Sequence, residues 1–301
     1  MKVFMTGATG YVGSRVADTL LAQGHQVIGL ARSTESEAAL GRRGIEPVRG
    51  NLNDADIMTA AVQAAGAVIH TAFVIERDPS ASVRAEGEAL AVLLSAVRGT
   101  NKPLISTSGT AVLGDTGTSI FDEQTLIAPH ARGQRIENEE MVLGARDARG
   151  IVLRPPNVYG HGDGHQTFDK LRHAGQKFKA IPYASGTGDN LWSAVHVDDL
   201  ADLYVLALTR SDGQQLYLAG AQSGVKTRDI AVALSRSMRW DGRTVELPIE
   251  ELRAAVPLPV FADYWATNSQ SSSEKAKRLL GWKPSRLDML GDIERLRPPA
   301  G

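Results

Sequence analysis

Residues 2–24 read KVFMTGATGYVGSRVADTLLAQG, a strand pattern that runs through three spaced glycines into an amphipathic helix pattern. Gly7 permits a tight turn, Gly10 lets backbone N–H groups approach a phosphate, and Gly13 lets the helix lie close to the strand. The positive end of the helix dipole then faces an anion bound at the turn. A second strand pattern follows at 26–31, which is the context of a dinucleotide site rather than of an isolated glycine turn. The sequence therefore predicts a nucleotide-binding strand–turn–helix unit.

Composition limits the classes of function. The chain has 301 residues, 43% of them hydrophobic, enough for one large α/β unit or two lobes. Its formal net charge is −1, with 33 basic and 34 acidic residues, so we expect no nucleic-acid partner. Cysteine is absent, which excludes disulfides and thiolate sites. The longest apolar stretch, 89–97, is too short to cross a bilayer, and the chain begins with a core strand rather than a signal peptide. We expect a cytoplasmic protein without a membrane partner.

Short apolar runs alternate with helical patterns through the first two-thirds of the chain. Strands are expected at 3–5, 27–30, 47–48, 67–70, 104–106 and 151–153. Helices are expected between them at 14–23, 35–43, 54–65, 80–98 and 133–147. This alternation indicates right-handed crossovers and a parallel sheet with helices on both faces, with ligands at the carboxyl ends of the strands. We predict an α/β fold, a Rossmann-like doubly wound parallel sheet.

The pattern changes after Arg154. Residues 155–164, rich in Pro and Gly, predict a functional loop without regular structure. Further elements are expected as a helix at 167–177, a strand at 192–197, a helix at 198–210, a strand at 215–219 that completes the sheet, and helices near 226–239, 249–255 and 272–280. We expect a dinucleotide-binding core over 1–160, completed by about 190–220. A smaller C-terminal helical substrate lobe would comprise 161–189 and 221–301.

Four segments, in this order, resemble the extended short-chain dehydrogenase/reductase superfamily, which includes nucleotide-sugar epimerases and dehydratases. They are 6–13 (TGATGYVG), 68–72 (VIHTA), 154–160 (RPPNVYG) and 194–201 (AVHVDDLA), and a fifth, 279–284 (LLGWKP), resembles the closing segment of those proteins. The resemblance thus extends over nearly the whole chain. It implies a nicotinamide-dependent enzyme of the epimerase/dehydratase family.

The resemblance also implies which residues contact the cofactor. The set is Gly7, Thr9, Gly10, Tyr11, Val12 and Gly13 at the pyrophosphate, Asn51 and Leu52 at the adenine, Thr71 and Ala72 under the nicotinamide ribose, and Pro156, Asn157 and Val158 at the carboxamide. Asn51 departs from the family, which usually has an acid there. For Asn157, capping of a turn is an equal alternative.

The end of the second strand bears on the choice between NAD and NADP. An NAD enzyme needs a carboxylate there to accept a hydrogen bond from the adenosine 2′-hydroxyl. This chain has Ala31 at that position, followed by Arg32 and Ser33. A guanidinium suits a 2′-phosphate, although a merely solvated Arg32 is the alternative. We predict NADP as the cofactor, with NAD less favoured.

The usual catalytic pair of the superfamily is missing. Members carry Tyr-x-x-x-Lys on the helix after the fifth strand, where the tyrosine exchanges a proton with the substrate. No such motif occurs in this chain. Aligning Pro129 with the proline that often precedes the tyrosine puts His130 at the tyrosine position and Gln134 at the lysine position. Arg135, one residue further, is an alternative contact to the cofactor ribose or a surface residue paired with Glu139.

Three residues remain as catalytic candidates: Ser108, Thr110 and His130. Imidazole is a competent general acid near neutral pH, although a surface histidine is the alternative. In the serine-rich turn after the fifth strand, the family's usual polar position falls on Gly109. The hydroxyls on either side of it are candidates to polarise a substrate oxygen or simply cap the turn.

Aromatic and polar residues near the expected cleft are candidate substrate contacts. They are Tyr159, Asp163, His165, Tyr183 and Trp192, of which Trp192 is as well explained as core. We expect no metal, because glycines in the loop around His161 and His165 do not fix ligand geometry. We expect His196 and Asp198 to hold the two lobes together.

These features favour an NADP-dependent oxidoreductase that reduces a carbonyl of a small-molecule substrate with a non-standard proton donor. The alternatives are a catalytically silent NADP-binding or sensor protein, and an epimerase or dehydratase acting on a sugar-like substrate. The helices at 80–98 and 133–147, where related proteins often pair, carry charges, so the chain is expected to be a monomer or a homodimer.

Overall fold

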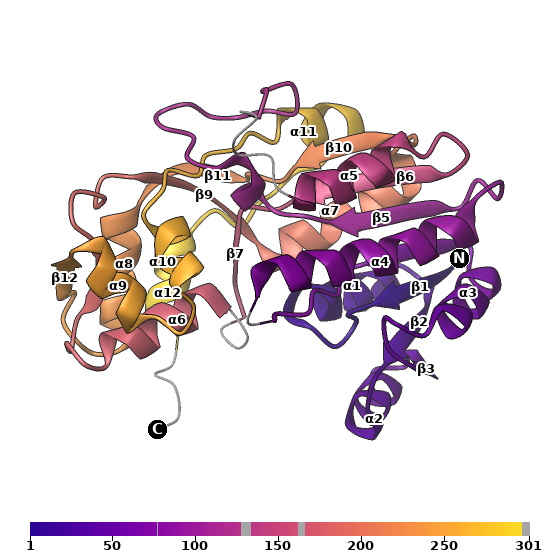
Figure 1. Ribbon diagram of the computed structural model, residues 1–301, viewed down its shortest axis with the longest axis horizontal. Coiled ribbons are helices and arrows are strands. Elements are labelled where there is room, and N and C mark those ends of the chain that lie inside the picture. The colour runs from indigo at the N-terminus through magenta and orange to yellow at the C-terminus, as the bar shows by residue number, and fades with distance from the viewer. Residues whose placement is uncertain (77, 128–133, 162–165, 297–301) are drawn as a thin grey trace.

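A seven-stranded parallel sheet forms the core of one half of the molecule, on the right in Figure 1. The computed structural model describes residues 1–76, 78–127, 134–161 and 166–296. The strands of this sheet are β1 (Lys2–Thr6), β2 (Gln26–Ala31), β3 (Glu46–Arg49), β4 (Ala67–His70), β5 (Pro103–Thr107), β6 (Arg149–Arg154) and β10 (Gln215–Leu218). Their order is β10-β6-β5-β4-β1-β2-β3. The order reverses between β1 and β4, which is the crevice where ligands bind in open α/β sheets.

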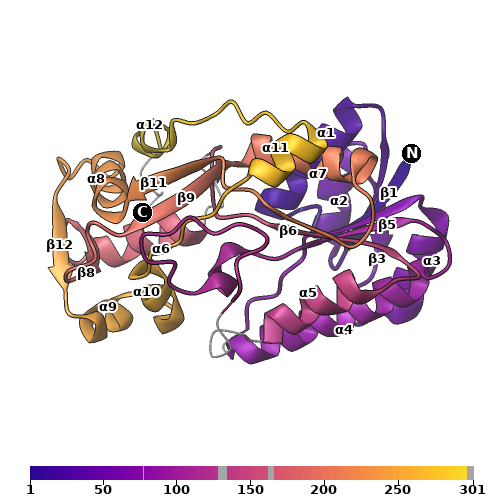
Figure 2. The ribbon, with the colours of Figure 1, turned by 90° about the horizontal axis from the view of Figure 1, so that it is seen from above.

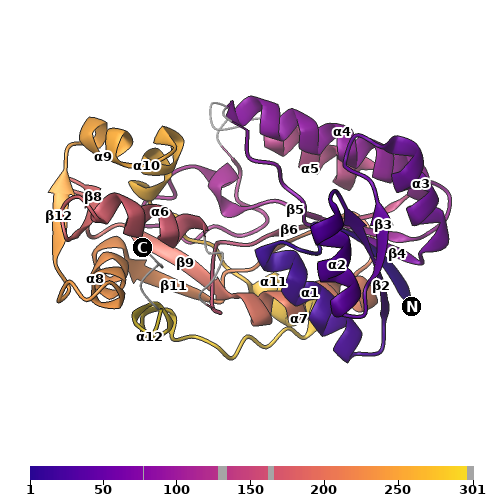
Figure 3. The ribbon, with the colours of Figure 1, turned by 90° about the horizontal axis from the view of Figure 1, so that it is seen from below.

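Helices cover both faces of this sheet, as Figures 2 and 3 show. One face carries α3 (Ala55–Ala64), α4 (Pro79–Val97) and α5 (Gln134–Gly144), and the other carries α1 (Tyr11–Ala22), α2 (Thr34–Arg42), α7 (Val197–Arg210) and α11 (Glu274–Leu280). A short 3₁₀ helix, η1 (Thr110–Leu113), follows β5. Each helix buries an apolar stripe, so β1, β4 and β5 lie in a dry interior and their ends stay in fixed register. None of the described helices combines the length and apolar character needed to span a bilayer.

The remaining elements pack around a hydrophobic cluster of their own, which includes Trp192, Trp265 and Phe168. They are β7 (Asn157–Tyr159), α6 (Gln166–Gly175), β8 (Ile181–Ala184), β9 (Leu191–His196), β11 (Gln222–Lys226), α8 (Thr227–Ser237), β12 (Thr244–Leu247), α9 (Ile249–Ala255), α10 (Pro259–Trp265) and α12 (Met289–Glu294). Strand β9 pairs with β7 in parallel and with β11 in antiparallel orientation, and β8 pairs with β12.

The predicted doubly wound parallel sheet is confirmed, and β10 completes it beside β6. The expectation of an irregular segment over 155–164 is wrong for β7, because Asn157 and Tyr159 pair with β9. The strand expected at 192–197 belongs to this second sheet, not to the central one. The C-terminal part is not purely helical either, since it contains β8, β11 and β12. Strands of three to five residues carry too little alternation to be recognised without their partners.

A buried ion pair ties α5 to the end of β6. Arg154 and Glu139 are only 5% and 3% exposed. Arg154 Nε lies 2.9 Å and 3.0 Å from the two carboxylate oxygens of Glu139, and Arg154 Nη2 also donates to Glu139. This bidentate geometry fixes α5 against the edge where β5 and β6 end.

Replacing Glu139 with alanine should lower the free energy of unfolding by about 3–5 kcal/mol, because it leaves the charge of Arg154 buried without a partner. The double variant Glu139→Leu, Arg154→Met should recover much of that loss. Asp147→Ala, which breaks the exposed pair with Arg98, serves as the control and should cost less than about 1 kcal/mol. Urea unfolding measures all three, and a single-variant loss as small as the control's would contradict the assignment.

The fully buried His70 should make stability depend on pH. Its Nδ1 lies 2.7 Å from Thr6 Oγ1. Burial, aided by the positive charge of Arg135, lowers the pKa of His70 from 6.5 to about 4. The unfolded chain therefore takes up a proton below pH 6.5 that the folded chain takes up only near pH 4. The free energy of unfolding should fall by about 3 kcal/mol as the pH decreases across this interval.

Urea unfolding at successive pH values tests this expectation. His70→Asn should lose the decrease in the free energy of unfolding between pH 6.5 and pH 4, whereas His173→Asn, at an exposed position, should keep it. Equal slopes for the wild type and His70→Asn would refute the role of His70.

Candidate functional site

The glycine turn lies against the end of β4 with no space for side chains between them. Gly7 has a φ of +76°, and a Cβ there would lie 2.7 Å from the backbone nitrogen of Ala72. A Cβ on Gly13 would lie 2.2 Å from the carbonyl oxygen of Gly7 and 2.5 Å from Thr71 Oγ1. Thr71 Oγ1 in turn donates to the carbonyl oxygen of Thr6 at 2.8 Å. The turn and the Thr71–Ala72 segment therefore form one rigid floor.

The N-terminus of α1 is open toward this floor. Gly10 is its N-cap and supplies no side-chain cap, and the first turn carries no acidic residue. Thr9 and Gly10 are exposed, and Tyr11 and Val12 are half-buried. Free N–H groups at a helix N-terminus, with a favourable dipole, suit a phosphate anion. The geometry thus fits a dinucleotide pyrophosphate.

The two polar side chains that follow β2, Ser33 and Arg32, have different environments. Ser33 caps α2, since its Oγ accepts from the backbone N–H of Ser36 at 3.2 Å. Arg32 is exposed and forms no hydrogen bond or ion pair with any other residue of the described ranges. Arg49, which pairs with Ala31 across the sheet, is held by Glu37 at 2.8 Å. Arg32 is therefore the guanidinium available to a ligand here.

After β3 the predicted adenine contacts serve a local turn. Asn51 donates from its backbone nitrogen and from Nδ2 to one carboxylate oxygen of Asp54, both at 2.7 Å. Asn51 Oδ1 accepts from the backbone N–H of Asn53. Leu52 packs against the hydrophobic cluster under α3 and α4. The acid that the family has at position 51 is thus replaced by an amide that shapes the loop.

Unpartnered polar atoms gather where β4, β5 and β6 end. Ser108 is 7% exposed and Asn157 5% exposed, and neither Ser108 Oγ nor Asn157 Nδ2 has a hydrogen-bond partner in the described structure. The same holds for His70 Nε2 and Arg135 Nε. A buried polar atom left without a partner costs about 1–3 kcal/mol, so several at one sheet edge indicate a place for a ligand's polar groups. The residues present fit a nicotinamide and a polar substrate there.

Arg135 brings a positive charge to this edge. Its Nη2 donates to Glu86 Oε1 at 3.0 Å and to the carbonyl oxygen of Thr107 at 3.3 Å. Its guanidinium lies over the ring of Phe73, 4.4 Å from the centroid. Burial raises the pKa of Glu86, and the charge of Arg135 opposes that effect. From the sequence, Arg135 is only an alternative contact to the ribose, because Gln134 occupies the position aligned with the missing lysine.

Three aromatic residues predicted to contact substrate have their polar groups satisfied inside the protein. The Tyr159 hydroxyl donates to the carbonyl oxygen of Arg286 at 2.6 Å, and Trp192 Nε1 donates to that of Thr267 at 2.8 Å. The Tyr183 hydroxyl bonds Glu246 at 3.1 Å. The further candidates His130, Asp163 and His165 lie outside the described residues.

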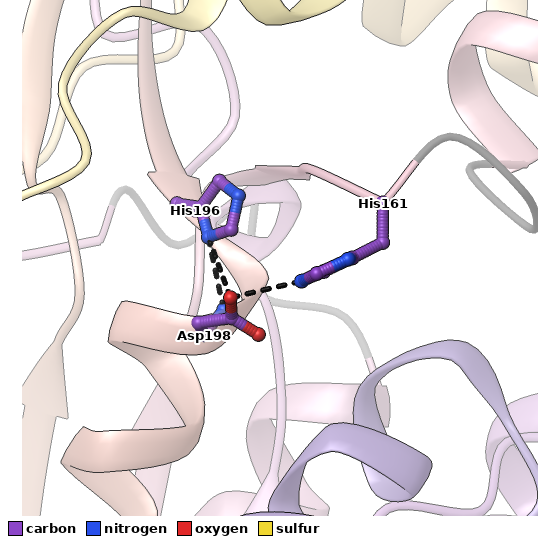
Figure 4. A group of neighbouring side chains, drawn as sticks. All are labelled: His161, His196 and Asp198. Carbon is purple, nitrogen blue, oxygen red and sulfur yellow. Dashed lines mark hydrogen bonds and ion pairs between the residues drawn. The ribbon is translucent and has the colours of Figure 1, made fainter.

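His161, His196 and Asp198 meet where the ends of β7 and β9 approach α1 and α7 (Figure 4). His161 Nε2 lies 2.8 Å from one carboxylate oxygen of Asp198, and Arg15 Nε donates to the other at 2.8 Å. Burial would raise the pKa of Asp198, but the hydrogen bonds from these two residues outweigh it and lower the pKa.

The ligand atoms of this trio lie within 4.8 Å of one another, a spacing that a metal ion could bridge. However, His196 Nδ1 already accepts from the backbone N–H of Asp198 at 3.1 Å, and His196 Nε2 lies 3.5 Å from Asp292. The Asp198 carboxylate is already balanced by a guanidinium. The trio is therefore better described as an ion-pair network that joins α1, α7 and α12.

A phenol that the sequence did not single out also reaches this edge. Tyr264, on α10, has its hydroxyl 3.5 Å from Ser269 Oγ, which lies 3.3 Å from Thr110 Oγ1. Thr110 itself is 1% exposed. The sequence signal for the helix that carries Tyr264 is Pro259 at its first position, together with Phe261 and Trp265 spaced four residues apart.

Known proteins share this architecture. Residues 3–220 match the NAD dependent epimerase/dehydratase family. The chain is 32% identical over 295 residues to an uncharacterized protein of Schizosaccharomyces pombe, covering 97% of this chain and 98% of the relative. It is 30% identical over 301 residues to an uncharacterized protein of Saccharomyces cerevisiae, again covering 97% and 98%. A solved UDP-glucuronic acid 4-epimerase from Bacillus cereus, in complex with NAD, shares the fold with a TM-score of 0.76 at 18% identity, covering 98% of this chain and 97% of that one.

More distant curated relatives carry the names of an epimerase, a dehydrogenase and reductases. The family match covers the glycine turn, the ends of β4, β5 and β6, and β10. It confirms the resemblance found in the sequence segments. The chain belongs to the NAD dependent epimerase/dehydratase family and is an enzyme of the NAD(P)-dependent oxidoreductase and epimerase type.

Proposed function

We propose that this enzyme is an NADP-dependent oxidoreductase that reduces a carbonyl group of a small molecule. The observation that supports this most is the pair of unpartnered buried atoms, Ser108 Oγ and Asn157 Nδ2, at the ends of β5 and β6. Both are hydrogen-bond donors, and a carbonyl oxygen is an acceptor that satisfies them. Reduced NADP, when bound, supplies the hydride.

The chain's own residues supply binding, orientation and exclusion of water. The N–H groups of α1 hold the pyrophosphate, and the Thr71–Ala72 floor supports the nicotinamide ribose. Pro156 and Asn157 face the carboxamide. The described elements within 161–189 and 221–301 form the substrate lobe, built around a hydrophobic cluster of their own.

The choice of NADP rests on Arg32. Its guanidinium is exposed and unpaired within the described ranges, and the end of β2 offers no carboxylate to a 2′-hydroxyl. A 2′-phosphate would give this cation two charge-assisted hydrogen bonds. Ser33 holds the first turn of α2 in place beside it.

Replacing Arg32 with alanine should weaken NADPH binding about 10- to 100-fold, the loss expected for a charge-assisted pair, and leave the weaker NADH binding unchanged. Titration calorimetry with both nucleotides measures this. Arg42→Ala, an exposed arginine at the far end of α2, is the matched control and should change neither affinity. Equal affinity of the wild type for NADH and NADPH would refute the preference for NADP.

Arg135 takes the place of the missing lysine as the cation beside the nicotinamide ribose. It lies over Phe73, which directly follows the floor residues, and its Nε lacks a partner. Glu86, on α4, holds its Nη2 and so fixes the guanidinium in place. A ribose hydroxyl oxygen is an acceptor for the hydrogen bond that Arg135 Nε leaves unmade.

Arg135→Met, combined with Glu86→Gln so that no charge stays buried alone, should weaken NADPH binding about tenfold. It should leave unchanged the binding of 2′,5′-ADP, which carries only the adenosine half of the cofactor. Arg32→Ala should weaken both ligands, so the two variants report on opposite ends of the site. Glu86→Gln alone is the control, and Arg135 has no cofactor role if the double variant binds NADPH as Glu86→Gln does.

A further inference from the structure

Tyr264 reaches from the C-terminal part of the chain to the edge where β5 and β6 end. Its hydroxyl lies 3.5 Å from Ser269 Oγ, and the side chains of Thr110 and Asn157 also interact with it. Thr110 follows β5 through η1, and Asn157 begins β7 directly after β6. One phenol thus touches both segments that border the expected nicotinamide.

Aromatic packing holds the Tyr264 ring in place. Its ring centroid lies 4.9 Å from that of Trp192, which in turn packs edge-on against Trp265 at 4.8 Å. Both tryptophans are fully buried, and Trp265 Nε1 donates to the carbonyl oxygen of Pro182. Ser269 is fixed by backbone hydrogen bonds to both Ser193 and Leu191. The hydroxyl of Tyr264 is therefore preorganised rather than free to swing.

The other five tyrosines of the chain are committed elsewhere by shorter bonds. The hydroxyls of Tyr11 and Tyr159 donate to backbone carbonyls at 2.7 and 2.6 Å, and those of Tyr204, Tyr217 and Tyr183 bond Thr107, Ser211 and Glu246 at 2.6, 3.0 and 3.1 Å. The Tyr264 hydroxyl instead lies at the longer distance of 3.5 Å from Ser269 Oγ, and the side chains of Thr110 and Asn157 also interact with it. It is the tyrosine best able to exchange its present contacts for a bond to a ligand.

We propose that the Tyr264 hydroxyl binds the carbonyl oxygen of the substrate and donates the proton that the reduction consumes. This rests on the proposed function. As the carbonyl carbon takes up the hydride from reduced NADP, the π-electron pair of the C–O bond moves onto oxygen. The Tyr264 O–H bond breaks while that oxygen gains the proton, which yields an alcohol and oxidised NADP. Water then reprotonates the phenolate through the hydroxyls of Ser269 and Thr110.

The surroundings of Tyr264 suit an acid. Burial raises its pKa, and the hydrogen bonds of Ser269, Thr110 and Asn157 oppose this effect. The phenol is therefore protonated at neutral pH, and an alkoxide is a stronger base than a phenolate, so transfer to the substrate is downhill. Ser108 Oγ, which has no hydrogen-bond partner in the described structure, donates to the developing oxyanion together with Asn157 Nδ2.

The test compares Tyr264→Phe with the wild type and with Tyr217→Phe, a control on β10. NADPH oxidation is followed with 4-nitrobenzaldehyde and a set of aliphatic aldehydes and ketones. Tyr264→Phe should lower kcat about 100-fold or more. Its dissociation constant for NADPH should stay within about twofold of the wild type, and its midpoint of urea unfolding should stay close to that of the wild type. Tyr217→Phe should leave kcat within about twofold. A kcat for Tyr264→Phe within threefold of the wild type overturns the inference and leaves the proposed function standing.

A second measurement does not need turnover. Isobutyramide, an unreactive carbonyl, is titrated into the NADPH complex while nicotinamide fluorescence is recorded. Tyr264→Phe should weaken its binding at least about fivefold relative to the wild type and Tyr217→Phe. Equal affinities overturn the contact between Tyr264 and a carbonyl oxygen. A wild type that binds NADPH but reduces none of the carbonyls overturns the proposed function itself, in favour of a catalytically silent NADP-binding protein.

Discussion

The contact between the glycine turn and the end of β4 sets the position of everything else in the site. A single methyl carbon on Gly13 would overlap the carbonyl oxygen of Gly7 and the hydroxyl of Thr71. Because β1 and β4 are neighbours at the point where strand order reverses, this contact brings the open N-terminus of α1 beside the ends of β4 and β5. The contact thereby fixes the distance between the open N-terminus of α1 and the ends of β4 and β5.

The parts that the sequence predicts correctly are those whose signal is local. Most strands of the central sheet are short apolar runs, and the glycine turn is recognised from the spacing of three glycines within seven residues. The parts that it misses depend on distant partners. Strand β7 has three residues and exists through pairing with β9, more than thirty positions later. Likewise, nothing local tells that Tyr159 and Trp192 satisfy their polar atoms on backbone carbonyls, or that Tyr264 meets Thr110.

The absence of the Tyr-x-x-x-Lys motif is explained by the position of the other polar groups, which reach the same edge of the sheet from different elements. Helix α5 still delivers a cation there, as Arg135, held by the buried Glu86. On our assignment the phenol comes from α10 instead. Parallel strands present their carboxyl ends together, so a side chain from any segment that crosses this edge has access to the same point. A fold of this kind tolerates moving a functional group from one element to another.

In this arrangement the cation, Arg135, lies on α5 and the proposed acid, Tyr264, lies on α10. This separation bears on the direction of the reaction. A lysine next to a tyrosine lowers the pKa of the phenol and lets it act as a base, which oxidation of an alcohol requires. Within the described part of the chain, no charged group shifts the pKa of Tyr264; burial raises it, and only hydroxyls and an amide oppose that. Arg135 is meanwhile balanced by Glu86. A phenol that stays protonated favours delivery of a proton over its removal. On our assignment, the site is thus better suited to carbonyl reduction than to alcohol oxidation.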